Sequence, residues 1–174
     1  MLEFITNADI QILLLIQENI RTPWLTPIVT FLTSLGNAGI LWVLLSALLL
    51  ISKKTRKIGW ASFIALFASL VINNLILKNL VARTRPYDAF QVLVPLVTRP
   101  SDFSFPSGHT GSSFASAYVL WRRLPKTAGI PALVMAALIG LSRLYVGVHY
   151  PSDVLVGLLT GILSGMLAQR IVKK

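Results

Sequence analysis

Residues 58–77 read "IGWASFIALFASLVINNLIL", twenty residues without a charge that end directly before Lys78. A helix needs about 20 apolar residues to cross the hydrocarbon core of a bilayer. The preceding stretch, residues 28–51, has 24 residues and is also uncharged. The chain of 174 residues is 55% hydrophobic and 13% charged, with a mean hydropathy of +0.73. Charged residues make up about 25% of an ordinary soluble domain, so these values predict a membrane protein.

Three further apolar stretches are richer in Gly, Ala and Ser, and we interpret them as helices that pack on other helices or line a cavity. They cover approximately residues 107–121, 128–148 and 153–170. The sequence therefore predicts an all-α, polytopic membrane helix bundle in a single domain, residues 1–174, with five transmembrane helices.

The segment 7–20 differs from these stretches because its apolar residues alternate with Asp9, Gln11, Gln17 and Glu18. A short amphipathic pattern of this kind is typical of a helix that lies on the membrane surface. An additional short span, which would be the sixth, is the alternative.

Ten basic residues of this chain, whose net charge is +10, lie in three clusters that contain no acidic residue. The clusters are Lys53, Lys54, Arg56 and Lys57; Arg122, Arg123 and Lys126; and Arg170, Lys173 and Lys174. Membrane proteins mark their cytoplasmic loops in this way, so we expect a membrane protein without a nucleic-acid partner. The C-terminus is then cytoplasmic, and the connections near 79–105 and His149 face the extracytoplasmic side.

Two compositional features limit the chemistry and the packing. The chain has no cysteine, which excludes a disulfide, a thiolate metal site and a cysteine nucleophile. Gly157, Gly161 and Gly165 recur at every fourth position of the last apolar stretch. Such a stripe lets helices approach closely, either within the chain or, as the alternative, in a homodimer.

Cationic and histidine side chains stand at the ends of the predicted spans, on the side expected to be extracytoplasmic. They are Lys78, Arg85, His109, Arg143 and His149. Ionisable groups at membrane depth are costly and usually functional. Taken alone, Lys78 suits a snorkelling lysine and Arg143 an interface anchor. Together, the cations predict an anion, and a phosphate group suits the donor fork of arginine.

The segment Pro106–Thr110, "PSGHT", opens the third predicted span. A helix N-terminus presents free N–H groups and a partial positive charge, so it binds anions. Gly108 would admit a phosphate close to the backbone, and Ser107 would add a hydroxyl donor. His109 would then stand beside the phosphate and give it a proton.

The second histidine, His149, precedes Asp153 by four residues at the start of the last span. A carboxylate on one imidazole nitrogen fixes the tautomer and leaves the other nitrogen free, which suits a nucleophile toward phosphorus. Other charged residues receive plainer interpretations. We expect Arg83 and Arg99 to be solvated or to contact head groups, and Asp88 and Asp102 to cap turns in a loop.

Three motifs in these segments resemble those of the type 2 phosphatidate phosphatase superfamily, whose site is similar to that of the vanadium haloperoxidases. The first is Lys, six residues, Arg-Pro, here Lys78 to Pro86. The second is Pro-Ser-Gly-His, here Pro106 to His109. The third is Ser-Arg, five residues, His, three residues, Asp, here Ser142 to Asp153.

The resemblance implies a role for each of these residues. Lys78, Arg85 and Arg143 would hold the phosphate oxygens, and Ser107 and Gly108 would add hydrogen bonds. His149 would form a phosphohistidine with the help of Asp153, and His109 would protonate the leaving oxygen. The family needs neither a metal ion nor another cofactor.

The sequence thus predicts a metal-independent lipid phosphatase of the cell membrane, similar to small bacterial members of this family. Its candidate substrates are phosphatidate, phosphatidylglycerol phosphate and undecaprenyl diphosphate. One alternative is a lipid-linked phosphotransferase with the same site. The other is a non-catalytic membrane protein that binds or transports anions.

Overall fold

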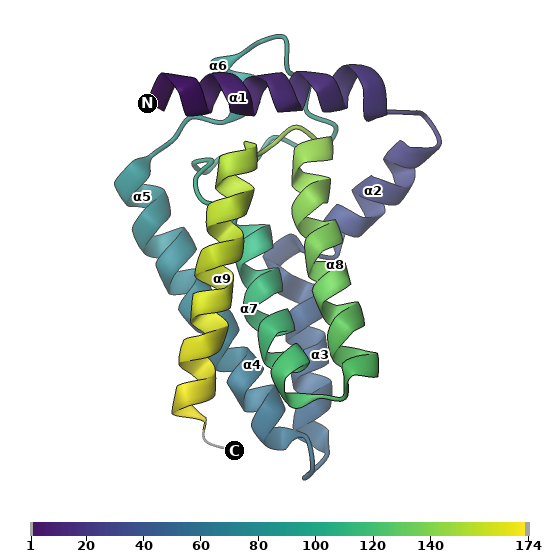
Figure 1. The fold of residues 1–174 in the computed structure, drawn as a ribbon, viewed down its shortest axis with the longest axis vertical. Coiled ribbons are helices and arrows are strands. Elements are labelled where there is room, and N and C mark those ends of the chain that lie inside the picture. The colour runs from purple at the N-terminus through teal and green to yellow at the C-terminus, as the bar shows by residue number, and fades with distance from the viewer. Residues whose placement is uncertain (1, 173–174) are drawn as a thin grey trace.

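The computed structural model describes residues 2–172, and this part of the chain is helical without a strand. Long helices stand side by side as a bundle, and α1 (Leu2–Leu15) lies across one end of it (Figure 1). The other elements are η1 (Ile16–Ile20), α2 (Leu25–Ser34), η2 (Asn37–Gly39), α3 (Ile40–Ile51), α4 (Arg56–Ser69), η3 (Leu70–Leu77), α5 (Lys78–Val81), α6 (Pro86–Ala89), α7 (Gly108–Arg123), α8 (Lys126–Tyr145) and α9 (Pro151–Ile171). The outermost residues of the predicted domain, Met1, Lys173 and Lys174, lie outside the described part.

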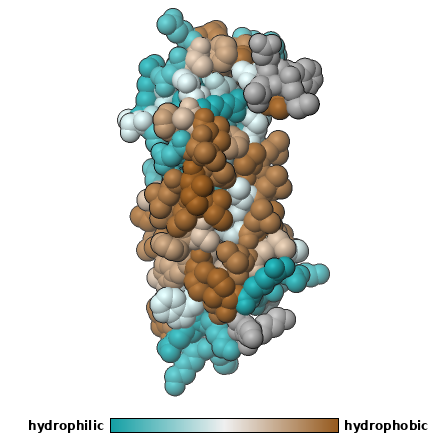
Figure 2. Space-filling view, turned by 90° about the vertical axis from the view of Figure 1, so that its left-hand side faces the viewer, coloured by the Kyte–Doolittle hydropathy of each residue, from teal (hydrophilic) through white to brown (hydrophobic). Residues whose placement is uncertain are grey.

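The apolar surface of the bundle forms a band between two hydrophilic ends (Figure 2). Within residues 2–172, three helical segments are long and apolar enough to cross a membrane: Arg56–Ala89, Lys126–Tyr145 and Pro151–Ile171. The pair α2 and α3 would be a fourth span. The remaining long helix, α7, has 16 residues, which is short for a full crossing. The chain is therefore a helical membrane protein, and length and composition support three or four spans, so the predicted count of five stays a prediction.

The predicted span 28–51 is bent instead of continuous. Its two halves, α2 and α3, meet at an angle of 52°. The backbone between them takes positive φ values at Ala38 and Gly39, 49° and 65°, which a continuing α-helix does not contain. Because of this bend, the segment that begins at Gly36 lies against the first turn of α7, where His109 is located.

The central helix of the bundle is α7, which packs against α4, α8 and α9. The glycine stripe of α9 provides the closest of these approaches. A Cβ atom built on Gly157, Gly161 or Gly165 would lie only 2.5–2.9 Å from main-chain carbonyl oxygens of α7 and the residue before it. The stripe thus serves packing within the chain. The homodimer contact considered from the sequence stays a prediction.

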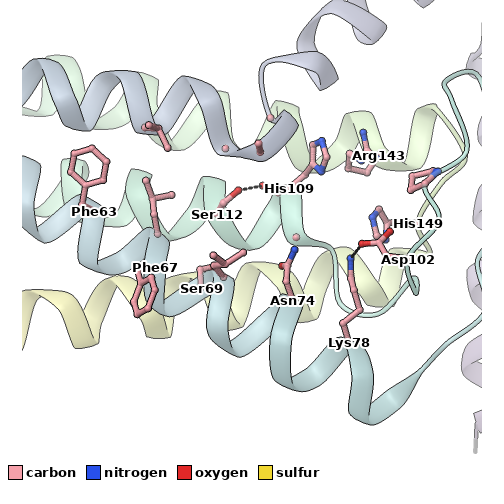
Figure 3. Close-up of a pocket in the computed structure, with 18 of the residues that line it drawn as sticks. Phe63, Phe67, Ser69, Asn74, Lys78, Asp102, His109, Ser112, Arg143 and His149 are labelled. Atoms are coloured by element: carbon pink, nitrogen blue, oxygen red, sulfur yellow. Dashed lines mark hydrogen bonds and ion pairs between the residues drawn. The ribbon is translucent and has the colours of Figure 1, made fainter.

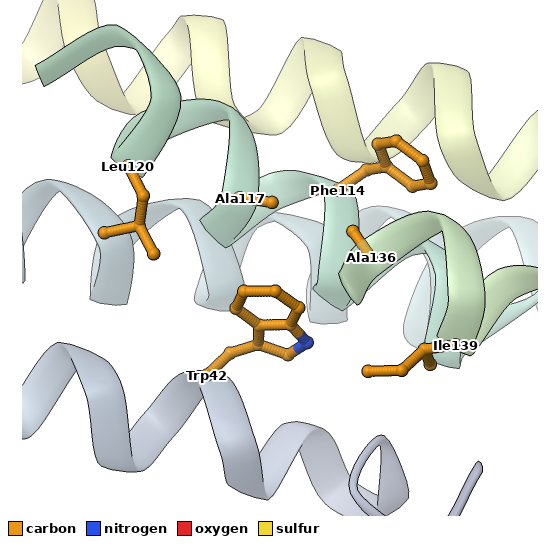
Figure 4. Packing of buried hydrophobic residues seen from close by; sticks show 6 residues of the cluster. All are labelled: Trp42, Phe114, Ala117, Leu120, Ala136 and Ile139. Carbon is orange, nitrogen blue, oxygen red and sulfur yellow. The ribbon is translucent and has the colours of Figure 1, made fainter. Parts of the chain in front are cut away.

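The interior is built from small and apolar side chains with a few internal hydrogen bonds. Trp42 of α3 is completely buried among residues of α7 and α8, as Figure 4 shows. Its indole Nε1 donates a hydrogen bond of 2.8 Å to Ser113 Oγ. Ser62 Oγ lies 2.6 Å from Ser46 Oγ and 2.7 Å from Ser116 Oγ. Hydrogen bonds between small polar residues hold membrane helices together where burial from water adds little.

The N-terminal helix is anchored to the end of the bundle that it covers. Leu13 of α1 is buried in a cluster with Leu93, Leu144, Tyr150 and Val154. The opposite face of α1 exposes apolar side chains, including Ile12 and Leu15. This arrangement agrees with a helix that lies on the membrane surface, because α1 runs across the bundle axis instead of along it (Figure 1).

Candidate active site

The three sequence motifs meet around one cavity of about 540 Å³. Six of the eight predicted site residues line it: Lys78, Arg85, Gly108, His109, Arg143 and His149. The charged and imidazole groups gather at one end, and Phe63 and Phe67 stand at the other (Figure 3). Ser107 and Asp153 are not among the lining residues. Both are fully buried.

Lys78 and Arg85 are buried cations that share one carboxylate. Lys78 Nζ donates to Asp102 Oδ2, and Arg85 donates to Asp102 Oδ1 over 2.5 Å and to the Asp102 carbonyl oxygen over 2.8 Å. The Lys78 and Arg85 side chains are 7% and 3% exposed, whereas that of Asp102 is 48% exposed. The interpretation of Lys78 as a snorkelling lysine is therefore wrong. So is that of Asp102 as a turn cap.

Asp102 lies in the connection between α6 and α7, outside the spanning segments, and it is held as a carboxylate. Partial burial would raise its pKa, but the hydrogen bonds and charges of Lys78 and Arg85 outweigh burial and lower the pKa to about 2. An anion that binds these two cations has to compete with this carboxylate.

The third cation, Arg143, belongs to the last turn of α8 and is 3% exposed. Its guanidinium donates a hydrogen bond of 2.6 Å to Thr33 Oγ1 at the end of α2. Among the described residues, its Nε has no hydrogen-bond partner. Buried in this way, Arg143 is no interface anchor, and its remaining donors are available to a ligand in the cavity.

His149 lies in the connection between α8 and α9, where its side chain is 2% exposed. Its Nδ1 is 3.4 Å from Asp153 Oδ2, and its Nε2 is 3.4 Å from an Arg85 guanidinium nitrogen. Both separations are long for a hydrogen bond, so the imidazole lies close to Asp153 without a tight contact. The side chain thus lies between the Asp153 carboxylate and the Arg85 guanidinium.

Burial decides the charge of His149. Burial lowers its pKa to about 4, the charges of Arg85 and Arg143 act in the same direction, and Asp153 opposes them only in part. At neutral pH the imidazole is therefore uncharged. With the proton assigned to Nδ1, on the side of the carboxylate, Nε2 carries the free lone pair.

Asp153 is bound by three donors besides its approach to His149. Its Oδ2 accepts hydrogen bonds from Ser104 Oγ and from the Tyr150 backbone N–H, the latter 2.9 Å long. Its Oδ1 accepts a hydrogen bond of 2.8 Å from Arg83. The expectation that Arg83 is solvated is therefore wrong: its side chain is 20% exposed and joins two carboxylates, Asp153 and Asp9. Arg99, in contrast, is exposed as expected.

The "PSGHT" segment forms the N-terminus of α7, with Ser107 as the N-cap. The Ser107 side chain accepts hydrogen bonds from the Thr110 backbone N–H and from Thr110 Oγ1, so its hydroxyl serves the cap. Gly108 packs closely on the preceding span, because a Cβ at this position would lie 3.0 Å from Asn74 Oδ1. His109 stands across the cavity, with its Nε2 3.0 Å from Asn37 Oδ1.

Several residues of the site could not be identified from the motifs. The sequence signal for Asn37 and Asn74 is that each interrupts an apolar run, and this signal alone does not mark them as residues of the site. Asn74 belongs to η3, a π-helical segment of eight residues that leads directly to Lys78. Single π-helical turns often mark functional sites, since they redirect the side chains that follow.

The positive charge of the site comes from amino-acid side chains. Within residues 2–172, no group of three or more His, Cys, Asp and Glu side chains is arranged to hold a metal ion. Lys78, Arg85 and Arg143 instead surround the polar end of the cavity, and the N-terminus of α7 faces it through Gly108.

Comparison with known proteins gives the family. The model of the PAP2 superfamily matches residues 57–174. An undecaprenyl-diphosphatase of Sulfolobus acidocaldarius is 35% identical over 147 residues, covering 84% of this chain and 70% of that protein. Phosphatidylglycerophosphatase B of Bacillus subtilis is 37% identical over 159 residues, covering 83% and 73%.

A solved structure agrees with this assignment. The crystal structure of a transmembrane PAP2-type phosphatidylglycerolphosphate phosphatase from Bacillus subtilis has a TM-score of 0.77 and 34% sequence identity. The similarity covers 95% of this chain and 85% of that one. The chain therefore belongs to the PAP2 superfamily, which confirms the resemblance of its motifs, and it is a phosphatase that resides in a membrane.

Proposed function

We propose that the protein is a lipid phosphatase that transfers the phosphate of its substrate to His149 and then to water. One observation carries the proposal. Three buried cations and two histidines, from distant parts of the chain, converge on the polar end of a single cavity whose other end is apolar. The cations suit a phosphate, and the apolar end suits a lipid tail.

The phosphate group is held by Lys78, Arg85 and Arg143, and the N-terminus of α7 adds a partial positive charge at Gly108. The charge that develops on the phosphate oxygens during transfer is stabilised by these fixed donors, so catalysis relies on positioning and electrostatics. Because Asp102 binds two of the three cations, its carboxylate gives way when the phosphate binds. The proposal needs no metal ion.

In the first step, His149 Nε2 attacks phosphorus, a P–N bond forms and the bond from phosphorus to the leaving oxygen breaks. His109 gives its proton to the leaving oxygen. Asp153 stabilises the positive charge that His149 acquires. In the second step, water attacks phosphorus and gives a proton to His109. The P–N bond breaks, and inorganic phosphate and neutral His149 are regenerated.

The apolar part of the cavity favours a lipid over a small phosphate ester. Its walls include Val43, Phe63, Leu66, Phe67 and Leu70, from α3, α4 and η3. Phe63 precedes Lys78 by fifteen residues, which corresponds to roughly 20 Å of helix. A tail beside these residues would lie parallel to the helices while its phosphate reaches the cations. Relatives named for undecaprenyl diphosphate and phosphatidylglycerol phosphate support such substrates, and phosphatidate remains a candidate.

We further propose that the site faces the extracytoplasmic side. The basic connections 52–55 and 122–126 lie at the end of the bundle opposite α1 and the site. If these connections are cytoplasmic, the site opens on the other face of the membrane. In this arrangement the chain makes five crossings, formed by α2 with α3, α4 with η3, α7, α8 and α9. Helix α7 is sheltered at the centre. Helix α1 lies on the outer surface of the membrane.

Phosphate release by the protein purified in detergent tests this proposal. Phosphatidate, phosphatidylglycerol phosphate and undecaprenyl diphosphate are offered in the presence of a chelator, with a short-chain soluble phosphate monoester for comparison. We expect release from at least one lipid, a much slower reaction with the soluble ester, and none by His149→Ala. Consumption of the lipid phosphate that needs an added acceptor alcohol, and that yields the phosphate ester of this alcohol instead of inorganic phosphate, would indicate a phosphotransferase. Activity in His149→Ala at the wild-type rate would refute the proposal.

A further inference from the structure

Asp9 is a buried acidic residue of α1. It is 4% exposed, whereas its neighbours Asn7 and Gln11 are exposed. Its Oδ1 accepts a hydrogen bond of 3.0 Å from the Ser152 backbone N–H, and its Oδ2 accepts from Ser152 Oγ and, over 2.9 Å, from Arg83. Burial of a carboxylate is costly unless it is fully paired, as it is here.

Arg83 is held by hydrogen bonds and by an aromatic ring next to the site. One guanidinium nitrogen donates to Asp153 Oδ1 and, over 2.7 Å, to Ser152 Oγ, and the other donates to Asp9. The Arg83 Cζ atom lies over the Tyr150 ring, 3.7 Å from its centre. A planar cation that stacks on an aromatic ring and binds two carboxylates cannot be replaced by lysine without loss.

The backbone of Arg83 reaches Asp153 by a second route. Its carbonyl oxygen accepts a hydrogen bond of 2.8 Å from the Ser104 N–H, and Ser104 Oγ donates to Asp153 Oδ2. Arg83 thus binds Asp153 Oδ1 directly through its guanidinium, and its backbone holds Ser104, which binds Asp153 Oδ2. No other described side chain binds Asp153 Oδ1.

We propose that Arg83 and Asp9 are positioning residues for catalysis, which hold the Asp153 carboxylate ionised and oriented toward His149. This inference rests on the proposed function of His149 and Asp153. It also gives α1 a role at the site, since Asp9 ties this helix to the first turn of α9 through Ser152.

The electrostatic consequence follows from the groups that face Asp153. These are Arg83, His149 and, across Arg83, the Asp9 carboxylate. The Tyr150 ring covers Arg83, and Arg85 lies beyond His149. Without the Arg83 charge, two buried carboxylates remain beside each other. Such a pair takes up a proton more readily than a single carboxylate. A protonated Asp153 no longer supports His149.

The test is the pH dependence of turnover in Arg83→Gln, Asp9→Asn and the double variant, measured as phosphate release from the best lipid substrate. In Arg83→Gln we expect kcat to fall by about 10- to 100-fold, as for other groups that orient a catalytic residue, with KM within about twofold. The acidic limb of its kcat profile should move to higher pH by about one unit or more. In the double variant, which retains one carboxylate, the limb should return toward that of the wild type.

Two exposed residues give matched controls: Arg99→Gln removes an equal positive charge, and Glu18→Gln removes an equal negative charge next to α1. Both should retain wild-type kcat and pH profile. If Arg83→Gln does not fold, as judged by its elution and melting temperature in detergent, Arg83→Lys takes its place. It should lower kcat while leaving the limb unmoved, because the charge remains.

The possible outcomes separate the inference from the proposed function. An inactive wild-type protein would reject the proposed function. An active wild type with an Arg83→Gln variant of unchanged kcat would overturn the inference alone. So would a variant of lower kcat and lower melting temperature whose acidic limb stays in place, because a purely structural contact has that signature.

Discussion

Replacing Asp102 by asparagine should strengthen the binding of inorganic phosphate, the expected product, to the site. Asp102 places one negative charge against Lys78 and Arg85, two of the three cations assigned to the phosphate. A phosphate displaces this carboxylate when it binds. Asparagine keeps the shape of the side chain and removes the charge, so it lowers the cost of that displacement.

The size of the effect on phosphate binding follows from the charges and from the exposure of Asp102. Two unit charges about 4 Å apart attract each other by roughly 4 kcal/mol at an effective dielectric constant near 20. Asp102 is 48% exposed, and solvent screening reduces the effect to about 1–2 kcal/mol. Since about 1.4 kcal/mol corresponds to a factor of ten, the inhibition constant of phosphate should fall by about five- to thirtyfold.

The assay is competitive inhibition of lipid hydrolysis by inorganic phosphate, with KM and kcat measured for the same lipid. Asp88→Asn is the matched control, because Asp88 is an exposed acidic residue of the nearby helix α6 and contacts neither Lys78 nor Arg85. It should leave the inhibition constant unchanged. An equal or higher constant in Asp102→Asn would refute competition, and would mean that Asp102 serves to orient the two cations.

Three further predictions concern the pH profile, the packing and the tail. Burial lowers the pKa of His149 to about 4, so protonation of this residue should reduce kcat/KM only when the pH falls to near 4. An acidic limb of the kcat/KM profile near pH 6.5 would contradict the buried position of His149. Gly161→Ala should destabilise the protein by about 1–3 kcal/mol in thermal unfolding, since the new Cβ would lie 2.5 Å from the Gly111 carbonyl oxygen; an unchanged melting temperature would show that the two helices separate easily. Phe67→Ala should raise KM for a long-chain lipid by about threefold to tenfold without affecting a soluble phosphate ester, and Phe31→Ala, which removes an exposed ring outside the cavity, should change neither.

The sequence predicted the parts of this protein that depend on local pattern. Uncharged runs longer than a bilayer core can only be helices in a membrane, so the all-helical fold followed from them. The position of the scarce histidines and cations at span ends predicted which end of the bundle holds the site. The structure places Lys78, Arg85, His109, Arg143 and His149 around one cavity.

The rest depended on distances between segments that no local pattern contains. Asp88 and Asp102 were both expected to cap turns in a loop, but Asp88 belongs to the short helix α6, and only Asp102 meets Lys78 and Arg85. Arg83 stands two positions from Arg85, but the extended backbone between them directs its side chain to Asp9 and Asp153 instead of the cavity. Which charge finds a partner is decided by the tertiary fold.

The bend between α2 and α3 is a second example. Uncharged residues fill the whole segment 28–51, so hydropathy could not distinguish a broken span from a continuous one. The break brings Asn37 to His109, and it brings Thr33 to Arg143. Two residues of the site therefore owe their hydrogen-bond partners to a feature that the sequence pattern did not reveal.

The most direct test of the account is to trap the phosphorylated enzyme. The wild-type protein is mixed with substrate labelled in the phosphate, quenched in alkali within one turnover, digested and analysed by mass spectrometry. We predict a label on His149 that is stable in alkali and lost in acid, as a P–N bond requires, and that is absent from His149→Ala. Rapid phosphate release without any labelled protein, or a label on another residue, would contradict the assignment of His149 as the nucleophile.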